Sequence, residues 1–154
     1  MKKLKTFLVL WLMALTLGYS LTSCDKEDMD IPGSITMKMR NKSNGGNSIY
    51  WNNSRAYLYI NESNNFFATD WYSAALEPSC IASVGKVKGL GSIKKIPESG
   101  WTHEISVIVG HGYVVRWIDN VTTQHSYARI FVQDEIVSTT GGIIGYTISY
   151  IEGM

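Results

Sequence analysis

From Ser34 onward, apolar and polar residues alternate along the chain with a period of two, which is the pattern of β-strands that are wet on one face. The clearest stretch covers residues 34–40, where Ile35, Met37 and Met39 share one face and polar residues share the other. No window of helical length places apolar residues three and four positions apart. The pattern therefore predicts an all-β fold.

Further strands are predicted where apolar or alternating runs lie between turn-forming residues. They cover residues 56–60, 105–109, 113–118, 128–132 and 144–150. The run 105–109 is expected to be the more fully buried one. Segments rich in Gly, Asn and Pro separate these runs, which predicts an antiparallel β-sandwich, with a partly open β-barrel as the alternative. The alternation breaks at residues 71–76, which predicts a one-turn helix there.

The first residues of the chain have the order of a signal peptide. Three lysines precede an apolar run over residues 8–17, and small residues then lead to Cys24. The apolar run is shorter than the roughly 20 residues that a membrane-spanning helix needs. Residues 1–23 are therefore predicted to be a cleaved signal and are excluded from the fold.

Residues 21–24, Leu-Thr-Ser-Cys, resemble the box that ends a bacterial lipoprotein signal. The resemblance implies that Cys24 carries a diacylglyceryl group and a further acyl chain, as palmitate or a similar fatty acid, and becomes the mature N-terminus. The hydrophilic run after Cys24 resembles the signal that sends Bacteroidetes lipoproteins to the outer face of the outer membrane. We therefore expect a lipid anchor at the cell surface, with the periplasmic face as the alternative, and a tether over residues 24–33.

Charge and cysteine content narrow the function classes open to the mature chain, residues 24–154, of which residues 34–154 are predicted to form one domain. Removing the signal with its three lysines leaves 11 basic against 13 acidic residues, a net charge of about −2. This balance, without a basic cluster, argues against nucleic acid as a partner. With Cys24 lipidated, Cys80 is the remaining cysteine, so no disulfide within the chain is expected.

Several short motifs follow one another in the second half of the chain. They are residues 85–91 (GKVKGLG), 96–101 (IPESGW), 110–114 (GHGYV) with Arg116, 127–130 (YARI) and 141–145 (GGIIG). In these motifs and their order, the chain resembles small Bacteroidetes lipoproteins built on a domain of unknown function. The resemblance covers roughly residues 34–150. It implies the lipoprotein class and the limits of the domain, and it implies no activity or site.

Residues in and near these motifs are the candidates for a binding site. They are His111, Tyr113, Arg116, Tyr127 and Arg129. The histidine stands between two glycines at a predicted hairpin tip, where it contacts a ligand or caps the turn. The arginines and tyrosines line a polar groove for an anionic or hydroxylated ligand, or they are solvated. The tryptophans and tyrosines of the domain supply surface for stacking sugars or anchoring a protein, unless they pack across the strands.

The candidate chemistry does not indicate a metal or a cofactor. The three histidines and Cys80 have no pair with the spacing of a zinc site. No nucleophile elbow or phosphate loop is present. A buried structural Cys80 is expected, and a thiol paired with His103 or His111 would make a small cysteine hydrolase the alternative.

We therefore predict a non-enzymatic binding or interaction module of the cell envelope, held to the membrane by its lipid. Its predicted partner is an envelope protein or a glycan. A small cysteine hydrolase and a purely structural envelope protein are the alternatives.

Overall fold

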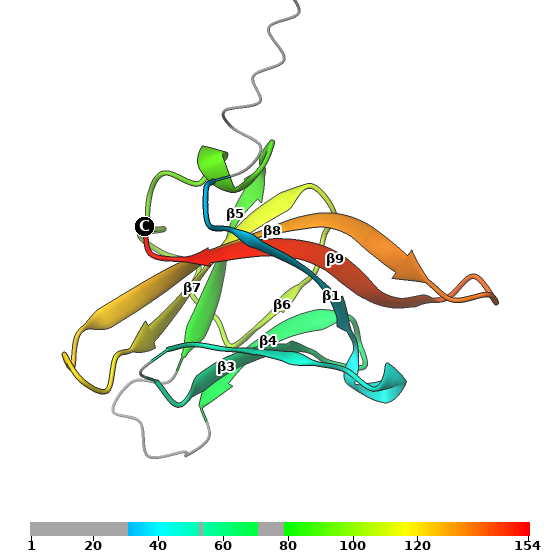
Figure 1. The fold of residues 1–154 in the computed structure, drawn as a ribbon, viewed down its shortest axis with the longest axis horizontal. Coiled ribbons are helices and arrows are strands. Elements are labelled where there is room, and N and C mark those ends of the chain that lie inside the picture. Colours follow the sequence, from blue (N-terminus) through cyan, green and yellow to red (C-terminus); the bar gives the residue numbers. More distant parts are fainter. Residues whose placement is uncertain (1–30, 53, 71–78) are drawn as a thin grey trace, which may run out of the picture.

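The computed structural model describes residues 31–52, 54–70 and 79–154, which form two β-sheets packed face to face (Figure 1). The five-stranded sheet has the order β1 (Ile35–Arg40), β9 (Ile143–Glu152), β8 (His125–Val137), β7 (His111–Ile118) and β5 (Cys80–Lys86). The four-stranded sheet has the order β2 (Ser48–Tyr50), β3 (Ala56–Ile60), β4 (Asn65–Asp70) and β6 (Glu104–Ser106). Two 3-10 turns, η2 (Lys42–Asn44) and η3 (Leu90–Ser92), lie between strands.

Neighbouring strands in both sheets pair antiparallel. The predicted all-β antiparallel sandwich is therefore confirmed, and the described strands form two separate sheets and no closed barrel. No helix within the described ranges is long and apolar enough to cross a membrane. The predicted signal peptide, the lipidated Cys24 and the one-turn helix at residues 71–76 lie outside the described residues.

The strands predicted from the alternation are confirmed in most cases. Residues 34–40, 56–60, 113–118, 128–132 and 144–150 correspond to β1, β3, β7, β8 and β9. The prediction at residues 105–109 was wrong in its extent and its burial. Strand β6 ends at Ser106, and Ile108 and Val109 are 46% and 39% exposed. The chain turns there, because the amide of His111 donates to the carbonyl of Ile108 and Gly110 takes a positive φ of 78°.

The main core lies between the two sheets. Ala56, Leu58 and Ile60 alternate along β3 and face the five-stranded sheet, each at most 1% exposed. From the opposite sheet, Val115 and Ile148 meet them in the same cluster, both fully buried. Burial of each such large side chain contributes about 1.5 to 3 kcal/mol to folding. Because alternate side chains of a strand point to opposite faces, burial of these residues places their neighbours in each strand on the outer face of the sheet.

A second, smaller core covers the outer face of the five-stranded sheet. Leu90, Ile93 and Val114 are buried there, and Trp101 packs against them from the segment that follows η3. A Cβ at Gly112 would stand 2.8 Å from the Cδ1 of Ile93. The glycine therefore permits the covering segment to lie this close to β7, which gives the 110–114 motif a structural role.

Candidate functional site

Tyr113 is fully buried between the sheets and does not reach the surface. Its hydroxyl donates to the carbonyl of Ser106 at 2.8 Å and accepts from the amide of Ile108 at 3.0 Å. Its ring meets Phe66 edge-on, with the centroids 5.1 Å apart. Burial raises the pKa of the phenol, and the bond from Ile108 opposes this. This tyrosine ties β7 to the end of β6 and is a core residue.

His111 stands apart from the other predicted site residues. It begins β7 and pairs with Lys86 at the far end of the β5–β7 ladder. Cys80 pairs with Arg116 at the opposite end, six positions along β5. At about 3.3 Å per residue this separation is roughly 20 Å, so His111 does not face the thiol.

Three predicted residues do share a surface, the outer face of the five-stranded sheet. The guanidinium of Arg116 lies over the ring of Trp101, with its carbon 4.7 Å from the centroid. Tyr127 pairs with Arg116 across the strands and contacts the same tryptophan, at 6.5 Å between centroids. The Nε of Arg129 donates to the carbonyl of Gly153 at 3.2 Å. Both arginines therefore make contacts within the protein. Arg116 makes a cation–π contact with Trp101, and Arg129 makes a hydrogen bond to the backbone.

The described hydrogen bonds around Cys80 involve His103, Ser79 and Asp70. Cys80 is the first residue of β5, and its side chain is buried, with 6% exposure. The Nδ1 of His103 lies 2.9 Å from the carbonyl oxygen of Ser79, the residue before the cysteine. The hydroxyl of Ser79 instead donates to Asp70, which also accepts the Ser79 amide. These bonds fasten the backbone at the start of β5.

The side chains within the described ranges include no group of three or more His, Cys, Asp or Glu that could hold a metal ion.

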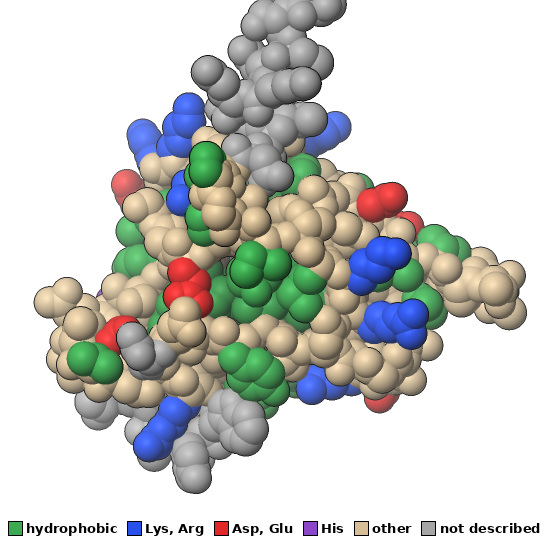
Figure 2. All heavy atoms as spheres, viewed as in Figure 1, with side chains coloured by type: hydrophobic (Ala, Val, Ile, Leu, Met, Phe, Trp, Pro, Cys, Tyr) green, Lys and Arg blue, Asp and Glu red, His purple; other side chains and the backbone are tan. Residues whose placement is uncertain are grey.

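A hollowed region lies on the open side of the sandwich, where β1 and β2 are the edge strands of their sheets. It consists of two hollows of about 430 and 360 Å³ that share Asn52 and Glu152, and we call them together the edge cleft. The larger hollow is lined by Gly33, Ile35, Tyr50, Asn52, Tyr150, Ile151 and Glu152. The smaller one is lined by Asn52, Trp117, Asp119, Ser126, Tyr127, Glu152, Gly153 and Met154. Figure 2 shows apolar side chains gathered in the middle of this face, with acidic side chains beside them.

Glu152 is the polar centre of the edge cleft. Its Oε1 accepts a hydrogen bond from the backbone amide of Asn52 at 3.3 Å. This bond joins the end of β9 to the residues after β2. Tyr150 lies on the same strand, and its pKa is raised by burial and, to a smaller extent, by the negative charge of Glu152. Tyr50 on the opposite wall is 58% exposed. The larger hollow thus combines a carboxylate and an amide with two tyrosines.

Asp119 lines the smaller hollow and also shapes the turn after β7. Its Oδ1 accepts from the amides of Val121 and Thr122, both at 2.8 Å, and from the hydroxyl of Thr122 at 3.2 Å. These bonds, the backbone ones above all, lower the pKa of the carboxyl group. Asp119 is therefore a fixed negative charge at neutral pH.

Trp117 lines the smaller hollow and stacks on Trp51, which lies behind it in the main core. Trp51 and Trp117 lie 4.9 Å apart between centroids and 10° from parallel, and Tyr150 meets Trp51 edge-on at 5.9 Å. Both indole Nε1 atoms are buried without a hydrogen-bond partner in the part of the chain that the structure describes. A buried donor left unpaired costs about 1 to 3 kcal/mol. Both tryptophans belong to the main core cluster, so core packing holds the indole pair in place.

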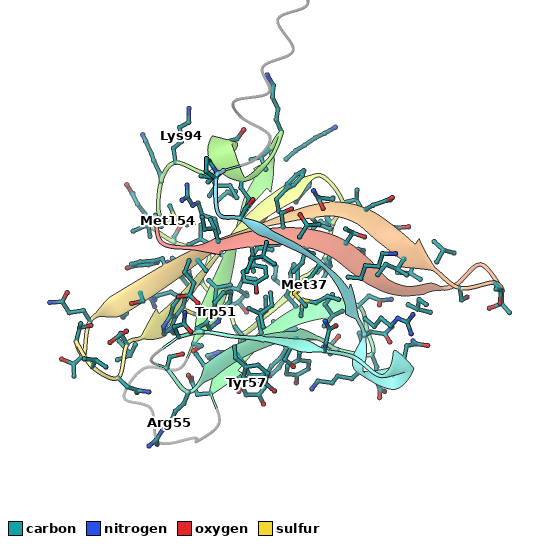
Figure 3. The ribbon with its side chains drawn as sticks, in the orientation of Figure 1. Met37, Trp51, Arg55, Tyr57, Lys94 and Met154 are labelled. Atoms are coloured by element: carbon teal, nitrogen blue, oxygen red, sulfur yellow. The ribbon has the colours of Figure 1, made fainter. Side chains whose placement is uncertain are left out.

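An aromatic strip extends from the cleft across the outer face of the four-stranded sheet. It consists of Tyr50, Tyr57, Tyr59 and Phe67, whose successive centroids are 5.7, 5.9 and 5.3 Å apart with planes 23° to 30° from parallel. Figure 3 shows Trp51 between the sheets and Tyr57 on the outer side of β3. With ring planes about 3.5 Å apart, these separations require a sideways offset of about 4 to 5 Å, so each ring leaves part of its face uncovered by the next.

Polar groups border the strip. The Nζ of Lys42 lies 4.4 Å above the ring of Tyr59. Beyond Phe67, the Oε1 of Glu104 accepts hydrogen bonds from the side-chain amides of Asn65 and Asn61, at 2.9 and 2.6 Å. These two hydrogen bonds lower the pKa of Glu104. The strip is thus an apolar surface with one cation and one anion at its border.

Sequence reasoning missed most of this site. Of the predicted residues, Tyr127 lines the cleft and Arg129 contacts it through Gly153. The alternating tyrosines at positions 57 and 59 lie in a strand that was predicted, and they were the available signal for the strip. The cleft itself depends on Asn52 meeting Glu152, and these two residues come together through the packing of one sheet on the other.

Comparison with known proteins gives no relative. No family model, no curated protein and no solved structure matches the chain.

The edge cleft and the strip together suit a ligand that has both apolar faces and many hydroxyl groups. Carboxylate oxygens accept hydrogen bonds from hydroxyls, and the amide of an asparagine both donates and accepts. Aromatic rings contact the C–H faces of such a ligand. The residues that line the cleft include no lysine or arginine, so a strongly anionic ligand has no counter-charge there.

Proposed function

We propose that this protein is a lipid-anchored protein of the bacterial cell envelope whose β-sandwich binds a glycan in the edge cleft. The observation that carries the proposal is that Tyr50 belongs both to the cleft, opposite Tyr150 and Glu152, and to the aromatic strip. A polar cleft that continues into an aromatic surface fits an extended chain of sugar rings. The polar groups of the cleft orient the bound sugar, and the rings of the strip provide apolar contact area for the rest of the glycan.

The glycan is favoured over the other partner class, an envelope protein. Protein interfaces have a core that is depleted of charged residues. Here a carboxylate stands in the middle of the cleft, and a second carboxylate, Asp119, stands beside it. Glu152 is exposed, so its carboxylate oxygens are accessible to hydroxyl groups of a sugar, which donate hydrogen bonds without a net charge.

The proposal also places the protein at the cell surface, held to the membrane by a lipid anchor. The lipoprotein box that ends at Cys24 supports an N-terminal lipid anchor, and the hydrophilic run after it supports the cell surface. The chain's likeness to Bacteroidetes lipoproteins is part of the same proposal. Replacement of Cys24 with Ala should release the protein from the membrane fraction, and mass spectrometry of the wild-type N-terminal peptide should detect the acyl chains. An unmodified N-terminal peptide in the wild-type protein would contradict the anchor and leave the cleft proposal intact.

Glycan binding is tested with the full chain and a panel of soluble oligosaccharides that includes xylan, glucan, mannan and chitin fragments. Calorimetry on the tightest binder compares the wild type with Glu152→Gln and Tyr50→Ala. Loss of a hydrogen bond to a charged group costs about 1.5 to 3 kcal/mol, so Glu152→Gln should weaken binding at least tenfold. Truncation of the exposed ring in Tyr50→Ala should weaken it several-fold.

Two control variants remove a carboxylate and an exposed apolar side chain at positions outside the cleft. Glu62→Gln removes a carboxylate from a loop, and Val137→Ala truncates an exposed apolar side chain on β8. Both should bind as the wild type does. Affinity that is unchanged in Glu152→Gln and Tyr50→Ala, or no binding by any oligosaccharide, would contradict the proposal, and capture of one envelope protein through the same residues would replace it.

A further inference from the structure

A second hollow lies on another part of the molecule and is lined by different residues from the edge cleft. It has a volume of about 470 Å³ and lies between β5 and the segment of residues 92–97, and we call it the outer groove. Its lining residues are Ser83, Val84, Val87, Ser92, Ile93, Lys94, Lys95, Ile96 and Pro97. This volume falls within the range of small-molecule sites.

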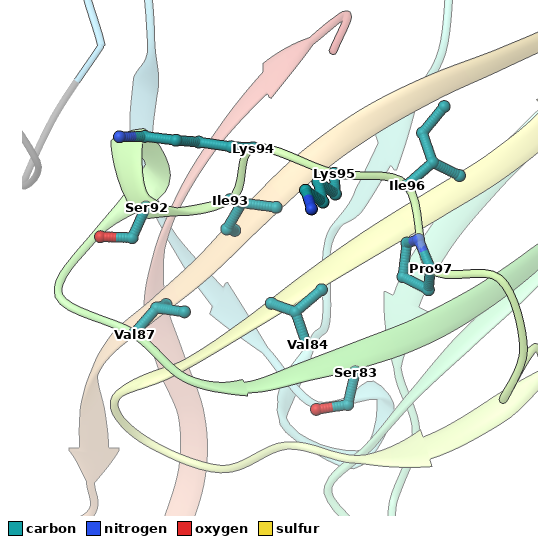
Figure 4. Close-up of a pocket in the computed structure, with 9 residues that line it drawn as sticks. All are labelled: Ser83, Val84, Val87, Ser92, Ile93, Lys94, Lys95, Ile96 and Pro97. Carbon is teal, nitrogen blue, oxygen red and sulfur yellow. The ribbon is translucent and has the colours of Figure 1, made fainter.

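The walls of the outer groove are apolar. Figure 4 shows Val84 and Val87 on the side of β5, and Ile93 and Pro97 pointing toward them from the covering segment. Both valines are half-buried, and Ile93 is part of the outer core. A chain of methylene groups that entered the groove would replace water against these walls, which is favourable in proportion to the area covered.

The backbone beneath the groove is specialised to keep these walls together. A Cβ at Gly112 would stand 2.8 Å from the Cδ1 of Ile93, 2.8 Å from a methyl of Val84 and 2.9 Å from a methyl of Val87. A residue with a side chain at this position would therefore push the two walls away from the sheet. The outer groove thus depends on a defined packing arrangement.

The border of the groove is positively charged. The stretch 86–98 carries four lysines and one acid, Glu98. Figure 4 shows Lys95 extending from the segment that roofs the groove, whereas Lys94 runs away along the segment. An anionic group held near Lys95 would gain a favourable charge interaction while an attached apolar chain lay against the valines.

The edge of β5 is not suited to pairing with a peptide strand, which is the other usual occupant of such a position. The pairing of β5 with β7 is interrupted by a bulge between Ser83 and Gly85, and Gly85 has a positive φ of 80°. Lys86 and Lys88 are exposed immediately after it. Bulges and lysines are the features that prevent strand addition at a sheet edge.

We propose that the outer groove binds a single-chain anionic amphiphile, with a fatty carboxylate as the simplest case. The acyl chain lies between Val84 and Val87 on one side and Ile93 and Pro97 on the other, and the carboxylate lies near Lys95. This site is independent of the edge cleft, and it takes a ligand of the opposite character.

The probes are decanoate, octanoate and decanol. The full chain, labelled with ¹⁵N and held in nanodiscs of zwitterionic lipid, is titrated with each probe, and empty nanodiscs measure partitioning into lipid. Decanoate should shift the amides of Val84, Val87 and Lys95 saturably. Because each fully buried methylene favours binding by about fourfold, octanoate should bind roughly four- to sixteenfold more weakly.

Two variants separate the charge from the walls. Lys95→Gln should weaken decanoate binding about two- to fivefold and leave decanol binding unchanged, with Lys42→Gln in η2 as its control. Val84→Thr keeps the shape of the side chain and should weaken both ligands, with the exposed Val109→Thr as its control. Thermal unfolding of each variant confirms that the fold is retained.

The proposal is overturned by any of three results. These are no saturable shift at millimolar decanoate, equal affinity for octanoate and decanoate, or equal effects of the groove variants and their controls. A further titration repeats the measurement in nanodiscs that contain anionic lipid and no decanoate. If these alone give the same shifts, and Val84→Thr does not change them, the lysines contact a membrane surface and the groove-bound chain is contradicted.

Discussion

The hydroxyl of Tyr113 connects the two sheets, and its removal tests the account of the core. In Tyr113→Phe the ring keeps its place against Phe66, but the carbonyl of Ser106 loses its donor and the amide of Ile108 loses its acceptor. A buried polar group left without its partner costs about 1 to 3 kcal/mol. Two such groups are affected, and Ile108 is partly exposed, so water compensates part of the loss.

We therefore expect Tyr113→Phe to lower the free energy of unfolding by about 2 kcal/mol, which corresponds to roughly 6 to 10 °C in Tm for a domain of this size. The measurement is urea unfolding followed by tryptophan fluorescence, with a shift in midpoint at an unchanged slope. Tyr127→Phe is the control, because the described contacts of Tyr127 are made by its ring. It should change stability by less than about 0.5 kcal/mol.

The same variant separates a structural role from a binding role for Tyr113. Oligosaccharide affinity should be unchanged at temperatures where the variant is folded, because the residue is fully buried. Unfolding energies that are equal in Tyr113→Phe and the wild type would refute the hydrogen bonds assigned to this hydroxyl, and with them the link between β6 and β7.

Three further outcomes are expected. Gly112→Ala should destabilise the fold by about 1 to 3 kcal/mol in urea unfolding, because the added methyl meets Ile93 at 2.8 Å, and a neutral effect would mean that the outer core relaxes freely. Burial raises the phenol pKa of Tyr113 and Tyr146 above 10.0, so their contribution to stability is complete below pH 10 and is lost as pH rises above it; a Tm that stays constant through this range would contradict their burial. Any hydrolase activity of the full chain should survive Cys80→Ala, and its loss with the fold intact would restore the enzyme alternative.

The fold class was predictable because the alternation of side chains is local information. The stretch 34–40 shows it clearly, and β1 follows with Met39 fully buried. Strand β5 was missed because alanine, serine and glycine within it weaken the alternation, and β2 because it has three residues. The predicted strand 105–109 was too long because the three consecutive apolar residues at 107–109 resemble a buried strand, whereas the chain turns at Gly110 to begin β7.

The site was less predictable because it is built from segments far apart in the sequence. Asn52 and Glu152 are 100 positions apart, and they meet because the two sheets pack with the end of β9 against the residues that follow β2. The strip was hidden for another reason. The segment 56–60 is apolar on both faces, so the pattern does not reveal that Tyr57 and Tyr59 point outward while Leu58 points into the core.

The most direct test of the edge cleft as a glycan site is to observe which amides a bound oligosaccharide perturbs in the unmodified protein. The ¹⁵N-labelled full chain is titrated with the tightest binder from the panel. Saturable shifts centred on Tyr50, Asn52 and Glu152, and extending to Tyr57 along the strip, are the predicted result. Saturable shifts confined to residues outside the edge cleft and the aromatic strip, or no shifts with any oligosaccharide, would contradict the central claim.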